Sequence, residues 1–230
     1  MAKHIGIVGC SAEGAALCYQ TICKEGAELM GEHAHPEISM HTYPLGDYMK
    51  YIYKNRWEGV TKLMVSSAKK LKSAGADFLI CPDNTIHEVF PDVKKKSPLP
   101  WLHIAREVAA EAIRQGFQKP AILGTKYLLT GSVYADAFKS MKLKFMVPTS
   151  SIRERIDRII FKELVYGVLK DDSRNYFHTQ IKIMAEKGCD SVVLGCTEIP
   201  LIVLPDESPL PVLDSTRILS RAALKHALKK

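Results

Sequence analysis

Val192-Val193-Leu194-Gly195-Cys196-Thr197-Glu198-Ile199-Pro200 is an apolar run that ends abruptly in a small polar cluster, with a thiol at its tip. Residues 191–194 predict a buried strand, because Val and Leu favour an enclosed, pleated environment. Gly195 allows a tight turn, which places Cys196 and Thr197 at the carboxyl end of the strand, where open α/β sheets bind ligands. The alternative is a buried cysteine in a strand-to-loop turn, since free cysteine is among the most buried residue types.

The first half of the chain repeats this pattern. Asp83 aligns with Cys196 at a separation of 113 positions, Gly75 with Gly188 at 113, and Gly9 with Gly124 at 115. Three matches at nearly one separation indicate a duplicated α/β unit. We therefore expect an α/β fold with two pseudo-symmetric domains and mainly parallel sheets facing a shared cleft, with Asp83 and Cys196 on its opposite walls.

Local patterns fill in this outline. Alternating or continuous apolar runs predict strands over 3–9, 37–43, 77–81, 121–123, 144–147, 191–194 and 210–215. Helices are expected from about residue 14 to 30 and over 56–74, 105–115, 133–141, 152–168, 173–187 and 215–229. We expect polar loops over 43–47 and 126–131.

Composition and charge exclude several classes of protein. Hydrophobic residues make up 47% and charged residues 25% of the 230 positions, as in ordinary globular proteins. The net charge of +7 is spread over dispersed lysines, so we expect no nucleic-acid partner. The six cysteines form no CxxC pair, which indicates neither a zinc site nor a disulfide framework. We find no signal peptide and no membrane span, and expect a cytoplasmic location.

The loop after the first strand is a candidate anion site. Gly6, Gly9 and Gly14 do not form the GxGxxG fingerprint of a dinucleotide-binding loop. Backbone N–H groups around Ser11 could instead hold a substrate carboxylate at the start of a helix. The alternative is a plain strand-to-helix turn.

Taken together, these motifs resemble the aspartate/glutamate racemase family. The resemblance is carried by Gly195-Cys196-Thr197-Glu198, its counterpart Asp83-Asn84-Thr85-Ile86-His87, and three further segments: 6–9, 123–125 and 211–214. It covers essentially the whole chain. It implies amino-acid racemisation without pyridoxal phosphate or metal, two domains around a cleft, and a homodimer. It also implies that the final helix returns to the first domain, so we expect domains at 1–103 with 215–230, and at 104–214.

Two positions depart from the family pattern. The family usually has a cysteine where this chain has Asp83, and Cys81 is expected at the buried strand end, where it would not substitute. Aspartate racemases also carry an arginine after the second strand and a lysine in the second half. This chain has no arginine over 43–48 and no clear lysine match over 162–167.

Racemisation needs two groups that flank one carbon, one acting as base and the other as acid. A thiol suits this role because its unperturbed pKa is about 8.5, and a helix N-terminus lowers it further. We expect Cys196 at such a helix start, opposite Asp83, whose alternative role is a helix N-cap. Glu198 would accept from the substrate ammonium or, alternatively, stabilise a helix start. The remaining candidates would hold substrate carboxylates: Ser11, Asn84, Thr85, Thr125 and Thr197.

The function that the sequence favours is a cofactor-independent amino-acid racemase acting at Cα of an acidic amino acid or related carboxylate. A single-cysteine lyase is the first alternative, for example a decarboxylase of a malonate-like acid, which needs only one proton donor. A catalytically silent carboxylate-binding protein is the second.

Overall fold

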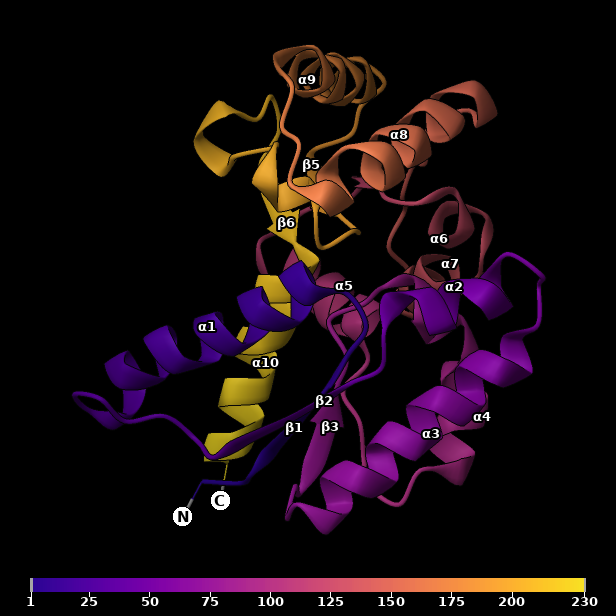
Figure 1. Cartoon of the computed structure of the whole chain (residues 1–230). Coiled ribbons are helices and arrows are strands. Elements are labelled where there is room, and N and C mark those ends of the chain that lie inside the picture. The colour runs from indigo at the N-terminus through magenta and orange to yellow at the C-terminus, as the bar shows by residue number, and fades with distance from the viewer. Residues whose placement is uncertain (1, 230) are drawn as a thin grey trace. The chain divides into compact units, whose positions relative to one another are not determined.

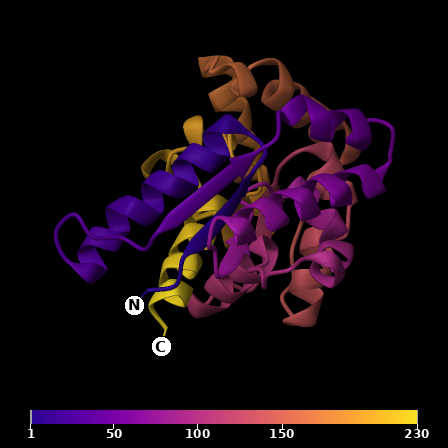
Figure 2. The same cartoon turned by 60° about the horizontal axis from the view of Figure 1, so that its bottom comes forward.

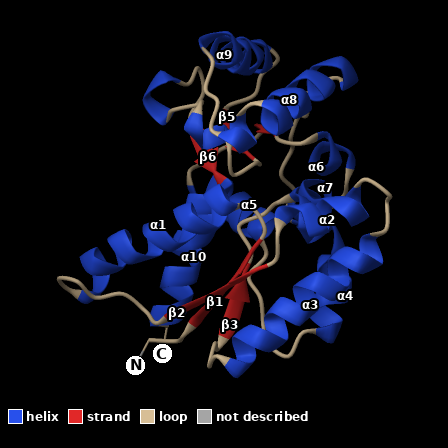
Figure 3. Ribbon diagram, viewed as in Figure 1, coloured by secondary structure: helices blue, strands red, loops and turns tan. Residues whose placement is uncertain are grey.

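The computed structural model describes residues 2–229, which form two compact α/β units (Figures 1 and 3). Unit 1 comprises Met1–Ile104 with Thr216–Lys230, and unit 2 comprises Ala105–Ser215. Each unit contains one three-stranded sheet, and every strand pair is parallel. The prediction of an α/β chain with two parallel sheets is confirmed.

In unit 1, β1 (Ile5–Gly9) lies between β2 (Ile38–Thr42) and β3 (Phe78–Ile80). Ile7 pairs with Met40 on one side and with Ile80 on the other. The helices are α1 (Ala12–Met30), α2 (Leu45–Ile52), α3 (Trp57–Ser73), the 3-10 helix η1 (Thr85–Val89), α4 (Phe90–Lys96) and α10 (Ser215–Leu228).

The sheet of unit 1 is covered on both faces. Helices α1 and α10 lie on one face and α3 on the other (Figures 1 and 2). Ile5 and Ile7 of β1 are completely buried in one apolar cluster with Ile22 of α1 and Leu219 of α10. Burying side chains of this size contributes roughly 1.5–3 kcal/mol each, so the last helix of the chain is part of the core that holds β1.

Polar contacts also fasten α10 to unit 1. The Lys3 amide donates a hydrogen bond to the Ala227 carbonyl at 2.9 Å, which joins the segment before β1 to the last turn of α10. The Arg221 guanidinium forms a two-pronged ion pair with Glu25 of α1, at 2.8 Å.

In unit 2, β5 (Ser191–Leu194) lies between β4 (Pro120–Leu123) and β6 (Val212–Asp214). Its core joins Val192 and Leu194 of β5 to Ile160 and Phe177 of the flanking helices. The helices are α5 (Ile104–Arg114), α6 (Lys126–Thr130), α7 (Val133–Ser140), α8 (Ser150–Lys162), η2 (Leu164–Tyr166), α9 (Asp171–Glu186), η3 (Ile199–Leu201) and η4 (Pro205–Glu207).

The two sheets share one topology once isolated bridges are included. In unit 1 the order is β2, β1, β3 and then Trp101, which forms a parallel bridge with Leu79. In unit 2 the order is Met146, β4, β5 and β6, with Met146 bridged in parallel to Ala121. Trp101 thus occupies the position that β6 has in unit 2, and Met146 occupies the position that β2 has in unit 1. This correspondence supports the internal repeat inferred from sequence.

Three local predictions were wrong. The expected strand over 144–147 contributes only the Met146 bridge, and Pro148, which has no N–H, follows closely. The expected loop over 126–131 contains α6, capped by the Thr125 hydroxyl, which accepts from the Leu128 amide at 3.2 Å. Helix α2 begins at Leu45, inside the other expected loop. No helix in the described part of the chain has the length and apolar character needed to cross a membrane.

Candidate active site

The polar tip of β5 holds a buried thiol beside a buried carboxylate. Cys196 and Glu198 are 9% and 4% exposed, and the Cys196 Sγ donates a hydrogen bond to Glu198 Oε2 at 2.9 Å. Thr197, between them, is also buried. A thiol in this setting has a built-in acceptor for its proton, which is the arrangement that a proton-transfer residue needs.

Two glycines bring the ends of β4 and β5 into contact. The Gly195 amide donates to the Leu123 carbonyl at 2.7 Å, and a Cβ on Gly195 would lie 2.9 Å from that same oxygen. A Cβ on Gly124 would lie 3.1 Å from the Gly195 carbonyl oxygen. Only glycine allows this approach, and it holds the loop of Thr125 against the loop of Cys196.

Asp214 and Ser215 at the end of β6, together with Tyr134 of α7, are three further groups that the sequence analysis did not assign to the site. The Ser215 hydroxyl donates a hydrogen bond at 2.7 Å to the carbonyl of Leu194, the residue before Gly195. Burial raises the pKa of the Tyr134 phenol well above its usual value, a hydrogen bond with Ser215 opposes this, and the nearby Asp214 carboxylate adds to the rise. Tyr134 therefore stays a neutral phenol at the carboxyl edge of the sheet of unit 2.

In unit 1 the structure brings Ser11 and Asp83 together. The Ser11 amide donates to Asp83 Oδ2 at 3.0 Å, while the Ser11 hydroxyl caps α1 by accepting from the Gly14 amide at 3.3 Å. Asp83 is half-buried and follows β3. The loops after β1 and β3 thus meet at the carboxyl edge of their sheet, just as the loops after β4 and β5 meet in unit 2.

Buried thiols and a buried phenol lie near the loop that carries Asp83. Cys10 and Cys81 are buried, with Cys81 fully so as expected, and the Cys81 Sγ lies 4.0 Å from the Asp83 carbonyl oxygen. Burial raises the pKa of the Cys10 thiol well above its usual value, and the adjacent Cys81 and Asp83 raise it further. Burial likewise raises the pKa of the Tyr48 phenol. Neither Cys10 nor Tyr48 is therefore poised to ionise.

His87 anchors the loop after β3, a role that its place in the motif did not reveal. Its Nε2 donates to the Cys81 carbonyl at 3.0 Å, and its ring stacks on Phe90 with 5.5 Å between centroids. Burial lowers the pKa of His87 to about 4, and the hydrogen bond to Cys81 only partly offsets this. His87 is therefore a neutral support for Asp83 at neutral pH.

Sequence comparison places these residues in a known family. The family model described as Asp/Glu/Hydantoin racemase matches residues 6–223. The chain belongs to the Asp/Glu/hydantoin racemase family. A candidate Asp/Glu racemase from Yersinia pestis has a similar structure with a TM-score of 0.90 and 30% identity, covering 99% of this chain and all of that one.

Two further relatives agree with this assignment. An aspartate racemase homologue from Pyrococcus horikoshii OT3 superposes with a TM-score of 0.84 and 31% identity, over 99% of this chain and 100% of its own. The broad specificity amino-acid racemase RacX of Bacillus subtilis is 22% identical over 168 residues, which is 71% of this chain and 70% of RacX. The family and these relatives together support an amino-acid racemase, and hence an isomerase.

Against this family background, the other candidate residues take the following positions. Asn84 is buried and precedes η1, and Thr85 begins it. The expectation that Cys196 begins an α-helix was wrong, because only the three-residue η3 follows, with Pro200 inside it. A single 3-10 turn has little macrodipole, so Glu198 is the local partner that the structure offers to the thiol.

A metal-dependent member of this fold would need a cluster of ligands. Across the described residues, no three His, Cys, Asp or Glu side chains gather closely enough to hold a metal ion.

Proposed function

We propose that this chain is a cofactor-independent amino-acid racemase acting at Cα of an acidic amino acid or related carboxylate. Cys196 exchanges a proton on one face of Cα and Asp83 on the other. The observation that carries the proposal is the buried Cys196–Glu198 hydrogen bond at the carboxyl end of β5. This hydrogen bond places a thiol, which can act as an acid or a base, beside a carboxylate that can accept the thiol proton.

In the forward step, Glu198 takes the thiol proton and the Cys196 thiolate removes the α-proton of the substrate. The carbanion that remains then takes a proton on its opposite face from protonated Asp83, which completes inversion. The segments that follow β1, β3, β4 and β5 provide amide and hydroxyl groups for the substrate carboxylates, from Ser11, Asn84, Thr85, Thr125 and Thr197. Neutral donors suit this role because they bind an anion without titrating near neutral pH.

One observation favours a second candidate function, a lyase that releases carbon dioxide from a malonate-like acid. The tip of β3 bears a carboxylate, Asp83, while the neighbouring Cys10 and Cys81 thiols are buried. Loss of carbon dioxide leaves a carbanion, and the Cys196 thiol alone suffices to protonate it.

Proton exchange separates these functions. The full chain is incubated in deuterium oxide with each enantiomer of aspartate and of glutamate, and separately with a substituted malonate. A racemase replaces the α-hydrogen with deuterium, a decarboxylase releases carbon dioxide, and a silent binding protein does neither.

Variants then assign the chemistry to its residues. Cys196→Ser should abolish exchange, whereas Cys23→Ser, in the middle of α1, should leave it intact. Unchanged exchange in Cys196→Ser would remove this thiol from the mechanism.

A further inference from the structure

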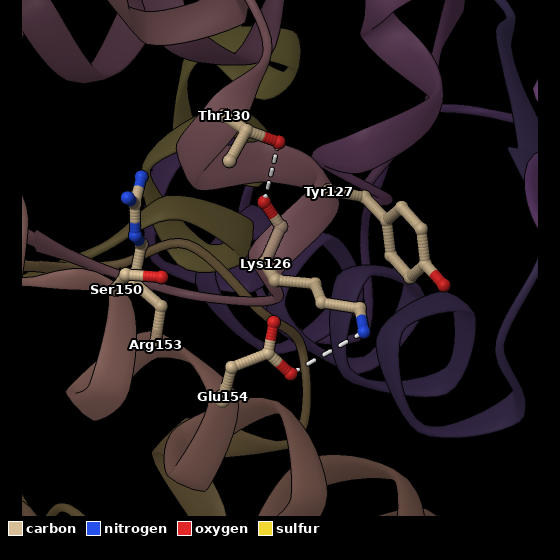
Figure 4. A pocket seen from close by; sticks show the side chains of 6 residues that line it. All are labelled: Lys126, Tyr127, Thr130, Ser150, Arg153 and Glu154. Atoms are coloured by element: carbon tan, nitrogen blue, oxygen red, sulfur yellow. Dashed lines mark hydrogen bonds and ion pairs between the residues drawn. The ribbon is translucent and has the colours of Figure 1, made fainter.

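Unit 2 contains a pocket that the proposed mechanism does not use. Its volume is about 270 Å³, and it lies between α6 and α8 (Figure 4). Neither Cys196 nor Glu198 lines it. The lining residues are Lys126, Tyr127 and Thr130 of α6 and Ser150, Arg153 and Glu154 of α8.

The pocket lies on the edge of the sheet where ligand sites occur. Helix α6 begins directly after β4, and α8 begins four residues after Met146, which pairs in parallel with β4. Both walls therefore start from the carboxyl ends of adjacent parallel segments. The Lys126 amide donates to the buried Asp157 carboxylate at 2.9 Å, so the two walls are fastened together.

The charges in the pocket are unevenly matched. The Arg153 guanidinium donates only to the Leu129 carbonyl, at 3.3 Å, and has no carboxylate partner among the residues that the structure describes. The Lys126 ammonium lies 3.4 Å from Glu154 Oε2, and these two side chains are 37% and 56% exposed. The Lys126 ammonium also lies 4.0 Å from Asp157 Oδ2. An ion pair that is this open to water contributes little, so each partner is available to a ligand.

We propose that this pocket is a second binding site, separate from the proposed catalytic residues, for an acidic amino acid. Such a molecule carries two carboxylates and one ammonium, and the side chains that line the pocket offer two cations and one carboxylate. Asp157, beside Lys126, already accepts a hydrogen bond from the Lys126 amide. The planar Arg153 fork suits a bidentate carboxylate. Lys126 faces the second carboxylate and Glu154 the ammonium. A neutral amino acid leaves one cation unmatched, and a dicarboxylate without an amine leaves Glu154 opposed to an anion.

The test is a titration of the isotope-labelled full chain, followed by the backbone amide signals of residues 126–130 and 150–154. Aspartate and glutamate should shift these signals saturably, and alanine should not. Succinate, which lacks the ammonium, should bind at least about tenfold more weakly than aspartate, since charge-assisted hydrogen bonds are among the strongest polar contacts.

Three variants sharpen the test. Arg153→Met should weaken aspartate binding at these signals at least about tenfold, and Glu154→Gln should remove the preference for aspartate over succinate. Arg158→Met removes the same charge from an exposed position of α8 and should change neither.

The proposal would be overturned if aspartate shifted only the amide signals of the loops that carry Asp83 and Cys196. Equal aspartate affinity in wild type and Arg153→Met would also overturn it. Failure of the racemase proposal shows differently, as an absence of α-proton exchange while the shifts at α6 and α8 persist.

Discussion

The thiol of Cys196 donates a hydrogen bond of 2.9 Å to the carboxylate of Glu198, which lies two residues further along the chain. Both side chains are buried, so water does not compete for either group. In the proposed mechanism the two residues act as one proton-transfer unit at the end of β5, and we expect the reactivity of the thiol to depend on its carboxylate partner.

Glu198→Gln tests this dependence. The amide keeps the size of the side chain but cannot take up the thiol proton, so α-proton exchange should fall about 10²-fold, the usual scale of general acid–base catalysis. Exchange is measured by NMR in deuterium oxide. Glu207→Gln, at an exposed position in η4, is the matched control and should retain full activity. Wild-type rates in Glu198→Gln would show that the carboxylate is only structural.

The proposed mechanism, in which Cys196 and Asp83 serve opposite faces of Cα, predicts unequal exchange rates for the two enantiomers. Unperturbed carboxyl and thiol groups differ in pKa by about 4–5 units, so a carboxylate is the weaker base. The enantiomer deprotonated by Cys196 should exchange readily and its mirror image slowly. Asp83→Cys should narrow this gap by placing a thiol on both faces. Equal exchange rates in the wild-type protein would contradict the asymmetry.

His87 should make the folded state sensitive to acid. Burial lowers its pKa from 6.5 to about 4, so the unfolded chain binds a proton that the folded chain excludes between these values. The stability due to neutral His87 is complete above about pH 6.5 and is lost as the pH falls toward 4. At pH 5 the loss relative to pH 7.5 should be about 2 kcal/mol.

Urea unfolding at both pH values measures this loss. His87→Gln retains a donor for the Cys81 carbonyl and should show a smaller difference in unfolding free energy between pH 7.5 and pH 5. His33→Asn is the control: it removes an exposed histidine, and asparagine tolerates the left-handed backbone conformation at this position. This variant should keep the wild-type difference in unfolding free energy between the two pH values. The same pH difference in wild type and His87→Gln would assign the effect to other groups.

Gly195→Ala should destabilise unit 2. The new Cβ would lie 2.9 Å from the Leu123 carbonyl oxygen, which is backbone and cannot move without separating β4 from β5. Overpacking of this kind costs about 1–3 kcal/mol. Gly46→Ala is the control, because nothing lies within 4 Å of its added Cβ, and alanine in helix α2 should stabilise the protein slightly. Thermal unfolding compares the two variants, and equal midpoints would refute the close approach.

The repeat made the fold predictable, because Gly9 and Gly124 mark equivalent turns and the strands around them are strongly apolar. Short elements escaped prediction for a physical reason. Helix α6 has only five residues, too few for an apolar periodicity, and it forms because Thr125 caps it. The 144–147 segment has a strand-like composition, but only Met146 reaches a neighbour.

The candidate site was predictable where chemistry and position coincide. Cys196, Glu198 and Asp83 follow strands and carry reactive groups, so their types and places in the chain single them out. The hydrogen bond between Cys196 and Glu198 depends on the turn between them, which no spacing specifies. Tyr134 and Ser215 meet through tertiary packing across 81 positions of the chain, and local sequence patterns carry no record of such contacts.

Because helix α10 belongs to unit 1 but follows unit 2 in the chain, unit 2 can complete its fold on the ribosome before unit 1 does. Strands β1, β2 and β3 are synthesised before unit 2, yet the core around β1 needs Leu219, Ala223 and Leu224, which are synthesised after unit 2. Residues 105–215 emerge before them and contain every strand of the second sheet. Unit 1 therefore cannot complete its core until α10 has been synthesised, and its apolar surface stays exposed while unit 2 folds. Nascent chains stalled before residue 216 should bind chaperones through the first sheet, and release of the final helix should end that exposure.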